Sequence, residues 1–253
     1  MKLLIDIGNT NIKFAKLSGK AIVKVCIVAH KDVELSLTNF VEENLTRSIT
    51  ALISNVSSPE IGLFIKDLLG EAFGISALFV EPRKIFDGFE TQYENPSKLG
   101  VDRWLGAYAA WSSLKDSVVV VDIGTAITID FVDEGGCHFG GFISPGFDAM
   151  SRGMCLTTAK LNVPENYRVS GDIPKSTNAA IVMGIHNSIF GSINHVYNET
   201  QRFPDKGFQK SQWVFTGGGL PVVSNKISWK HLIKPNLVLE GLGLFASIVD
   251  FDA

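Results

Sequence analysis

The sequence contains little of what marks secreted, membrane-spanning or nucleic-acid-binding proteins. Its three cysteines, Cys26, Cys137 and Cys155, are too few and too scattered for a disulfide framework and lack metal-ligand spacing. No apolar run approaches the roughly 18 residues of a membrane span, and Asp6 interrupts the N-terminal apolar stretch too early for a signal peptide. The formal net charge is −3 and no four Lys or Arg residues cluster, which argues against binding to nucleic acid or an anionic membrane. We therefore expect a cytoplasmic protein.

Two familiar nucleotide-binding signatures are missing or incomplete. The chain has no G-x-x-x-x-G-K-[ST] phosphate loop. The segment "LEGLGLFA" does contain a G-x-G-x-x-A pattern at Gly241, Gly243 and Ala246. A dinucleotide site, however, needs an acid on a following strand about 20 residues later, and none follows within these 253 residues. We expect these glycines to serve close helix packing instead.

Strand and helix patterns alternate along the chain. With 45% hydrophobic and 19% charged residues, the composition is that of an ordered protein. Helical spacing of apolar residues occurs in 36–45 (opened by a Ser/Thr cap), 60–74, 100–114, 148–160 and 178–197, and strand patterns occur in 49–56, 76–80, 137–146 and 212–218. No low-complexity linker interrupts the pattern. We predict an α/β protein with two domains, 1–115 and 116–253.

One motif occurs twice and points to phosphate chemistry. In "KLLIDIGNTNIKF" and "SVVVVDIGTAITIDF" a buried strand ends at an acid, Asp6 or Asp122, and a glycine follows two residues later. A second apolar run follows each time, over 11–17 and 126–132, so both motifs predict hairpins. One such acid alone would be read as a turn or cap. Two in matching contexts, 116 residues apart, indicate carboxylates that hold a cation, beside glycine turns whose backbone N–H groups approach phosphate.

This duplication resembles the actin-like ATPase and sugar-kinase superfamily. The resemblance implies a duplicated actin-like (ribonuclease H-like) two-domain fold with a central nucleotide cleft. The segment "VFTGGGLPVV" adds a strand, then Thr216, Gly217 and Gly218, then a predicted helix. In that superfamily the matching segment borders the adenosine, although three glycines after a strand are also compatible with a flexible turn.

The segment "YENPSKLGVDRW" carries the most specific residues. Asp102 and Arg103 fall in the first turn of the helix predicted over 100–114. The helix dipole favours an acid there but opposes a cation, so Arg103 suggests a bound anion or a paired carboxylate. Asp102 could act as base for a substrate hydroxyl, because phosphoryl transfer depends mostly on positioning and charge neutralisation.

Taken together, the motifs resemble those of type III pantothenate kinases. The matches are "DIGNTNIKF", "YENPSKLGVDR", "DIGTAITID", "GGFISPG", "TGG" and "LVLEGL", in the family's order over almost the whole chain. The resemblance implies transfer of the γ-phosphate of ATP to pantothenate, giving 4'-phosphopantothenate in the first step of coenzyme A biosynthesis. It also implies Mg²⁺ with ATP, a monovalent cation (K⁺ or NH₄⁺), and a homodimer.

The same resemblance assigns residue roles. Asp102 would be the catalytic base, Asp6 would bind the divalent ion, and Asp122 would lie by the monovalent cation. The implied pantothenate-binding residues are Tyr93, Gly100, Val101, Arg103 and Thr177. The implied ATP-binding residues are Asp6, Gly8, Asn9, Thr10, Asn11, Lys13, Gly124, Thr125, Ala126, Thr216, Gly217 and Gly218. After Thr216, Gly217 and Gly218 the family commonly has an acid or amide followed by alanine, whereas this chain has Gly219 and Leu220. We therefore expect adenine to be bound loosely.

Several alternatives stay open from the sequence alone. Asp130 either matches the family pattern or caps its hairpin, and Lys13 either reaches a phosphate or is a solvated strand lysine. The five histidines (His30, His138, His186, His195 and His231) share no ligand or triad spacing and are interpreted as structural or surface residues; Trp104, Tyr108 and Trp111 are interpreted as core. The rival functions are another actin-like phosphotransferase, disfavoured by "YENPSKLGVDR", and a non-enzymatic relative, disfavoured by three retained carboxylates.

Overall fold

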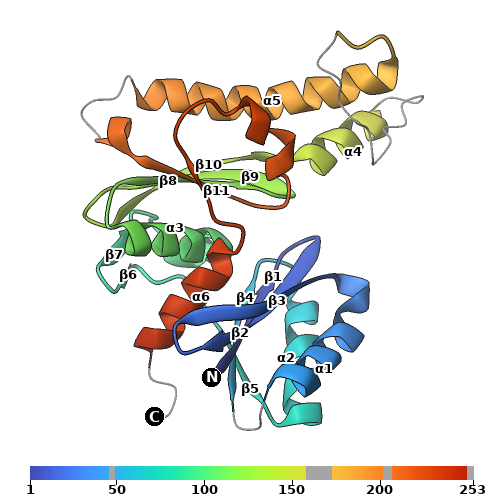
Figure 1. Ribbon diagram of the computed structural model, residues 1–253, viewed down its shortest axis with the longest axis vertical. Helices are drawn as coiled ribbons and strands as arrows, with labels where there is room; N and C mark the ends of the chain where they lie inside the picture. Colours follow the sequence, from blue (N-terminus) through green and yellow to red (C-terminus); the bar gives the residue numbers. More distant parts are fainter. Residues whose placement is uncertain (46–48, 158–172, 202–206, 250–253) are drawn as a thin grey trace. The chain divides into compact units, whose positions relative to one another are not determined.

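The chain forms two compact units. The computed structural model describes residues 1–45, 49–157, 173–201 and 207–249 (Figure 1). One unit comprises Met1–Lys115, Glu134–Phe139 and the chain from Asn236 onward, and the other comprises Asp116–Asp133 and Gly140–Pro235. The chain therefore passes between the units several times. The division into domains 1–115 and 116–253 stays a prediction.

A five-stranded mixed sheet organises the first unit. Its order is β3-β2-β1-β4-β5, with β1 antiparallel to β2 and parallel to β4. The strands are β1 (Lys2–Ile7), β2 (Asn11–Ser18), β3 (Ala21–Ala29), β4 (Thr50–Asn55) and β5 (Ser76–Phe79). β1 and β4 are buried on both faces, which explains their continuous apolar runs.

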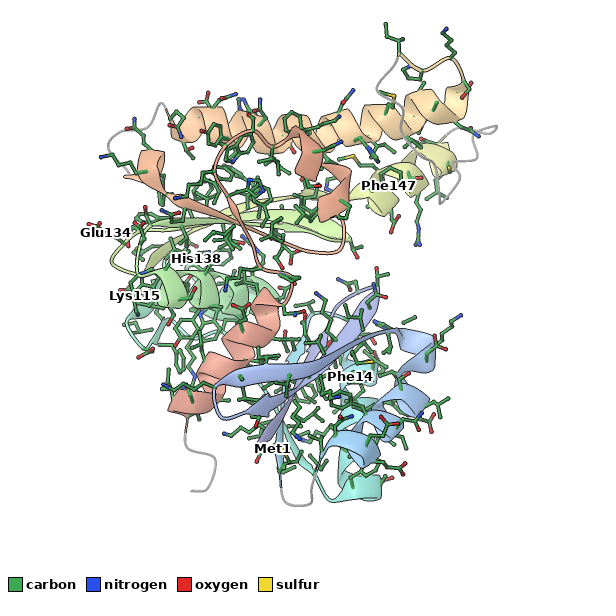
Figure 2. All side chains as sticks on the ribbon, viewed as in Figure 1. Met1, Phe14, Lys115, Glu134, His138 and Phe147 are labelled. Carbon is green, nitrogen blue, oxygen red and sulfur yellow. The ribbon has the colours of Figure 1, made fainter. Side chains whose placement is uncertain are left out.

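Helices cover both faces of this sheet (Figure 1). On one face lie α1 (Val33–Asn44) and α2 (Pro59–Phe73), packed on a core that includes Phe14, whose ring centroid lies 5.0 Å from that of Phe40 (Figure 2). On the other face lies α6 (Leu237–Ile248), which also packs on α3 (Val101–Leu114). A side chain at Gly241 would collide with the Leu105 carbonyl oxygen, which confirms the predicted close helix packing.

A short hairpin and an aromatic cluster accompany α3. The hairpin consists of β6 (Ile85–Phe86) and β7 (Phe89–Thr91), and β7 also pairs in parallel with the first residues of β10 (Cys137–Pro145). Rings of Phe86, Phe89, Trp104, Tyr108 and Phe245 lie 4.9–6.3 Å apart between centroids. Trp104 and Tyr108 are fully buried and Trp111 is 6% exposed, so their assignment to the core is confirmed.

The sheet of the second unit repeats the first strand for strand. Five strands of a seven-stranded sheet lie here in the order β12-β11-β8-β9-β10, followed by β7 and β6, with β8 antiparallel to β9 and parallel to β11. The strands are β8 (Val118–Ile123), β9 (Ala126–Val132), β11 (Gln212–Thr216) and β12 (Leu232–Ile233), besides β10. β8 therefore occupies the place of β1. This shared topology is the structural form of the duplicated D-x-G motif.

One long helix packs on the core of the second unit. α5 (Thr177–Thr200) runs along one face of this sheet (Figure 1) and buries Ile181, Ile185, Ile189 and Ile193 at four-residue spacing. α4 (Phe147–Thr157) packs on α5; residues 158–160 of the helix predicted over 148–160 lie outside the described residues. No helix in the described parts of the chain has both the length and the apolarity to cross a membrane.

Two sequence predictions of secondary structure were wrong, and one long strand was not predicted. α1 begins at Val33 instead of after a cap at Ser36, because Val33 joins Leu37 in the buried face. The helix predicted after Gly219 is two short 3₁₀ turns, Leu220–Val222 and Ser224–Lys226, in a segment where Gly and Pro lower helix propensity. Strand β3, rich in Val and Ile, was not predicted although its composition favours a strand.

Candidate active site

The first hairpin places Asp6 near the end of β1, between two neighbouring strands. Its backbone partners are Lys13 on β2 and Ser54 on β4. Ser54 is fully buried, and its hydroxyl donates a hydrogen bond to Asp6 Oδ1 at 3.1 Å. The Ser54 hydroxyl thus orients a half-buried carboxylate at the end of a buried strand.

The turn after β1 presents polar groups on an ordered backbone. The Gly8 N–H donates to the Asn11 carbonyl oxygen at 3.1 Å, and the Gly8 carbonyl accepts from His30 Nε2 at 2.8 Å. The side chains of Asn9, Thr10 and Asn11 are exposed. Two contacts therefore hold Gly8 while the polar residues of the turn stay accessible, as a phosphate-binding turn requires.

The second hairpin repeats the environment of Asp6 at Asp122. Asp122 pairs with Thr128 on β9 and with Thr216 on β11, just as Asp6 pairs with Lys13 and Ser54. Thr216 is 4% exposed. A buried hydroxyl residue therefore stands beside the strand-end carboxylate in both units.

The turn of the second hairpin is one residue shorter. The Gly124 N–H donates to the Ala126 carbonyl at 2.9 Å, and the Gly146 N–H donates to the Thr125 carbonyl at 3.0 Å. Thr125 and Ala126 are exposed. Gly146, which ends the segment "GGFISPG", thus holds the turn of the second hairpin through this backbone hydrogen bond.

The triple glycine lies against the end of β8. Gly217 has φ +93°, and a side chain at this position would collide with Asp122 Oδ1. The Gly219 N–H donates to the Ile123 carbonyl at 2.7 Å, while Gly218 is exposed. Glycine is therefore required at 217 both by the backbone conformation and by the neighbouring carboxylate.

The N-terminus of α3 holds the candidate base. Gly100 is the N-cap residue, and Asp102 Oδ1 accepts a hydrogen bond from the Arg103 backbone N–H at 2.7 Å. A Cβ added at Gly100 would lie 2.7 Å from the same oxygen. The absence of a side chain at 100 thus leaves room for the Asp102 carboxylate in the first helical turn.

Arg103 is buried and points back to Tyr93. It is 8% exposed, and its Nη1 donates to the Tyr93 hydroxyl at 2.8 Å. The Tyr93 ring also lies beneath the guanidinium, with 5.8 Å from Cζ to the ring centroid. Such a buried cation in a first helical turn, where the dipole disfavours it, fits a site for an anionic ligand.

Further along α3, a hydrogen bond anchors the helix to the β6–β7 turn. The Tyr108 hydroxyl donates to Asp87 Oδ2 at 2.8 Å. Burial, followed by the hydrogen bond and charge of Asp87, raises the pKa of Tyr108 well above its ordinary value. The hydroxyl therefore remains a donor at physiological pH and steadies the helix that carries Asp102.

The structure brings the predicted residues together in three groups. In the first unit, Asp6, Gly8 and Lys13 share the first hairpin, and Tyr93, Gly100, Asp102 and Arg103 meet at the start of α3. In the second unit, Asp122, Gly124, Thr216 and Gly217 meet at the end of β8. Val101, the first residue of α3, is 7% exposed, and Thr177, the first residue of α5, is exposed. Asp130 lies inside β9 and is 1% exposed, so it does not cap the hairpin.

Two residues at the first hairpin were missed by reading the sequence. Ser54 contacts Asp6, and His30 contacts Gly8. The only signal for Ser54 is its place at the end of the strand predicted over 49–56, next to a strand that ends at Asp6. Nothing local to His30 distinguishes it.

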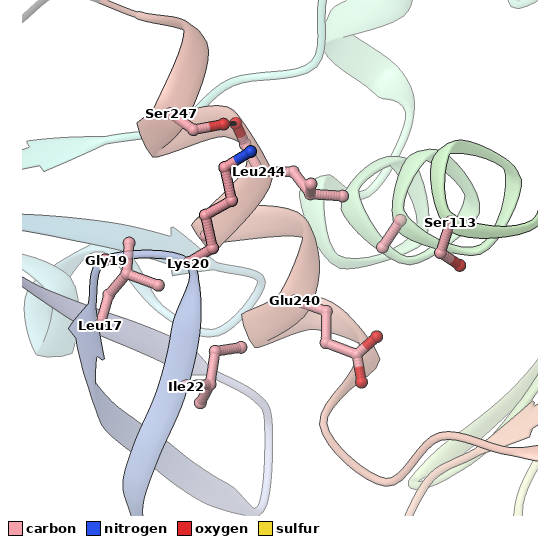
Figure 3. A pocket seen from close by; sticks show the side chains of 10 residues that line it. Leu17, Gly19, Lys20, Ile22, Ser113, Glu240, Leu244 and Ser247 are labelled. Atoms are coloured by element: carbon pink, nitrogen blue, oxygen red, sulfur yellow. Dashed lines mark hydrogen bonds between the residues drawn. The ribbon is translucent and has the colours of Figure 1, made fainter.

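A cavity of about 420 Å³ lies elsewhere in the first unit (Figure 3). It is lined by residues of the β2–β3 turn, α3 and α6, namely Leu17, Gly19, Lys20, Ile22, Ala109, Ser113, Glu240, Gly243, Leu244 and Ser247. None of the predicted site residues lines it. Among the described residues, no three His, Cys, Asp or Glu side chains gather as a metal site.

Comparison with solved structures defines the fold. The chain is similar to an inorganic polyphosphate/ATP-glucomannokinase from Arthrobacter, with a TM-score of 0.51, 13% identity and 98% of each chain covered. It is also similar to a Campylobacter jejuni protein described as a Baf family transcriptional activator, with a TM-score of 0.60, 25% identity and 97% of each chain covered. The predicted α/β, actin-like fold is confirmed: this is the fold of the actin-like ATPases and sugar kinases.

Comparison of sequences then defines the family. Residues 2–199 match the family model of type III pantothenate kinases. A type III pantothenate kinase from a Marinomonas species is 31% identical over 244 residues, covering 96% of this chain and 93% of the relative. The chain belongs to the type III pantothenate kinase family, and it is an enzyme of the kinase class. The resemblance stated from the motifs is confirmed.

Proposed function

We propose that this protein transfers the γ-phosphate of ATP to pantothenate, giving 4'-phosphopantothenate in the first step of coenzyme A biosynthesis. The observation that carries the proposal is the group of residues at the start of α3. There Asp102 lies beside a buried Arg103, which donates a hydrogen bond to the Tyr93 hydroxyl. Membership of the type III pantothenate kinase family supports the same reaction. The rival acceptors, a sugar, acetate or a polyol, leave the segment "YENPSKLGVDR" unexplained.

In this proposal Asp102 accepts the proton of the pantothenate hydroxyl as that oxygen attacks the γ-phosphorus, while the bond from the γ-phosphorus to the β–γ bridging oxygen breaks and ADP leaves. Arg103 and Tyr93 bind the polar, negatively charged substrate, with Gly100 and Val101 shaping the pocket. A buried guanidinium offsets the repulsion between two anionic substrates. By resemblance to the family, Thr177, exposed at the start of α5, is also assigned to pantothenate binding.

The ATP phosphates are assigned to the first hairpin. Asp6, held by Ser54, supplies a carboxylate for Mg²⁺, which takes one or two carboxylates together with phosphate oxygens. The donor set fits that ion, which when bound neutralises phosphate charge. Gly8, Asn9, Thr10 and Asn11 offer exposed turn groups to the phosphates, and Lys13 lies beside Asp6 on the neighbouring strand.

The second hairpin is assigned to the monovalent cation and to further contacts with ATP. Asp122 lies by the monovalent cation, K⁺ or NH₄⁺, with Gly124, Thr125 and Ala126 as the turn toward ATP. A carboxylate oxygen is the hard ligand that such a cation prefers. The nucleoside end is assigned to Thr216, Gly217 and Gly218, whose approach to the end of β8 keeps backbone groups close to a flat ligand.

We also propose that the protein is a homodimer in the cytoplasm. Each chain is proposed to have two domains, residues 1–115 and 116–253. Exposed large apolar side chains of the second unit support self-association, since Phe142 is 57%, Ile143 64% and Leu156 87% exposed. The free cysteines are compatible with a reducing compartment. Light scattering after size-exclusion chromatography tests the dimer, and a monomeric mass at micromolar concentration would contradict it.

The first test is ADP release by the purified protein with Mg-ATP and pantothenate, with and without K⁺ or NH₄⁺. We expect release that needs both pantothenate and the monovalent cation. Asp102→Asn should lower turnover at least about 100-fold, the usual range for loss of a general base, with an unchanged thermal midpoint. Release with sugars or acetate but not pantothenate would favour another phosphotransferase, and no metal-dependent nucleotide binding would favour a non-enzymatic relative.

A further inference from the structure

A fully buried histidine lies next to the proposed pantothenate site. His138, labelled in Figure 2, is 0% exposed at the start of β10. Its backbone partner across the parallel pair is Thr91, the last residue of β7. Side chains of paired residues share a face of a sheet, and their neighbours two positions away lie on that face too. Phe89 and Tyr93 are those neighbours.

The imidazole contacts all three side chains of that face. Its Nδ1 lies 3.0 Å from Thr91 Oγ1 in a buried hydrogen bond. Its ring is nearly parallel to those of Phe89 (20°, centroids 5.8 Å apart) and Tyr93 (10°, centroids 6.1 Å apart). The His138 ring therefore packs nearly parallel to the Tyr93 ring and favours that ring orientation.

The same contacts fix the backbone that carries Tyr93. The Tyr93 N–H donates to Thr91 Oγ1 at 3.2 Å, and the Gln92 N–H donates to the His138 carbonyl at 2.8 Å. Tyr93 lies beyond the end of β7, so no strand partner of its own holds it. Thr91 Oγ1, shared between His138 and the Tyr93 N–H, takes over that task.

We infer that His138 is a positioning residue for pantothenate binding, acting through Thr91 and Tyr93 on the buried Arg103. The Tyr93 hydroxyl accepts from Arg103 Nη1 at 2.8 Å, so a shift of the tyrosine displaces the guanidinium as well. The inference rests on the proposed function, because it takes Tyr93 and Arg103 as the residues that bind the substrate. His138 itself makes no proton transfer.

The experiment compares His138→Phe, which keeps ring stacking but removes Nδ1, with Thr91→Val, which removes the shared hydroxyl. Steady-state kinetics of the full-length protein are measured with pantothenate and ATP varied in turn. Loss of a net hydrogen bond corresponds to about a 5- to 10-fold effect. We expect KM for pantothenate to rise by that factor in each variant, with kcat and KM for ATP within about twofold.

Two further variants separate positioning from general stability. His231→Phe is a matched control, because His231 also makes a ring hydrogen bond (Nδ1 to the Trp229 carbonyl, 2.9 Å) and an aromatic contact, but lies in the second unit. It should lower the thermal midpoint without changing KM for pantothenate. His138→Asn, which restores a polar group near Nδ1, should bring KM back toward the wild-type value relative to His138→Phe.

The outcomes are distinguishable. An unchanged KM for pantothenate in both folded variants overturns the inference, as does a fall in kcat alone that follows the loss of thermal stability. If His138→Phe does not fold, Thr91→Val decides by the same criterion. Absence of pantothenate-dependent ADP release in the wild type would overturn the proposed function instead.

Discussion

A methyl group at residue 100 should move the proposed catalytic base. In Gly100→Ala the new Cβ would lie 2.7 Å from Asp102 Oδ1. That is roughly 0.8 Å inside the lower end of ordinary packing distances, about 3.5 Å. The backbone at Gly100, with φ −56° and ψ 132°, suits alanine, so the carboxylate must move and not the chain.

The magnitude follows from what holds the carboxylate. Asp102 Oδ1 accepts from the Arg103 N–H at 2.7 Å, and rotation away from the methyl group weakens this charge-assisted bond, worth about 1.5–3 kcal/mol. A reacting group displaced by about 1 Å loses roughly 100-fold in rate. We expect kcat to fall about 10- to 100-fold, or about 1.4–2.7 kcal/mol in the barrier, with a smaller effect on KM for either substrate.

Gly106→Ala is the matched control within the same helix. A Cβ there would lie 3.7 Å from Leu237 Cδ2, an ordinary contact, and alanine should stabilise the helix interior by about 0.8–1.0 kcal/mol. ADP release and thermal unfolding are measured for both variants. A kcat for Gly100→Ala within about twofold of wild type, or an equal loss in Gly106→Ala, would refute the reasoning.

Three further changes test other parts of the site and fold. Ser54→Ala removes the 3.1 Å hydrogen bond to Asp6, so kcat/KM for Mg-ATP should fall about 10-fold in an ATP titration at fixed pantothenate; no change would show that Ser54 does not orient the carboxylate. Gly217→Ala places a side chain at φ +93° against Asp122, so the free energy of unfolding in urea should fall by about 1–3 kcal/mol, and an unaltered midpoint would contradict this. Burial lowers the pKa of His186, so the unfolded state takes up the proton first, and stability present above pH 6.5 should be lost as the pH falls below it. In His186→Phe the thermal midpoint should change less between pH 7 and pH 5.5 than in wild type, and equal changes would rule out this source.

Much of the proposed site could be predicted from the sequence, because its signals are local. A buried strand that ends at Asp6 or Asp122 and turns at a glycine is a pattern of fewer than ten residues, and both predicted hairpins are confirmed. Gly100 and Asp102 are close in the chain as well as in the first turn of α3. Local patterns also sufficed for the family resemblance.

Helix and strand limits were less well predicted where packing overrides local preference. α1 starts one turn early because Val33 is buried, a fact that depends on the sheet beneath it. The segment after Gly219 forms 3₁₀ turns, although a strand followed by glycines is compatible with a helix. β6, β7 and β12 have only two or three residues each, too few to show an alternating pattern.

The sequence by itself determined the two hairpins, the start of α3 and the family, since each depends on neighbouring residues. Only the tertiary structure decided which distant side chains support them. Ser54 meets Asp6 across a parallel pair of strands, and His138 meets Thr91 in the same way. Parallel strands are joined by long connections, so their partners lie far apart in the chain and leave no spacing to read.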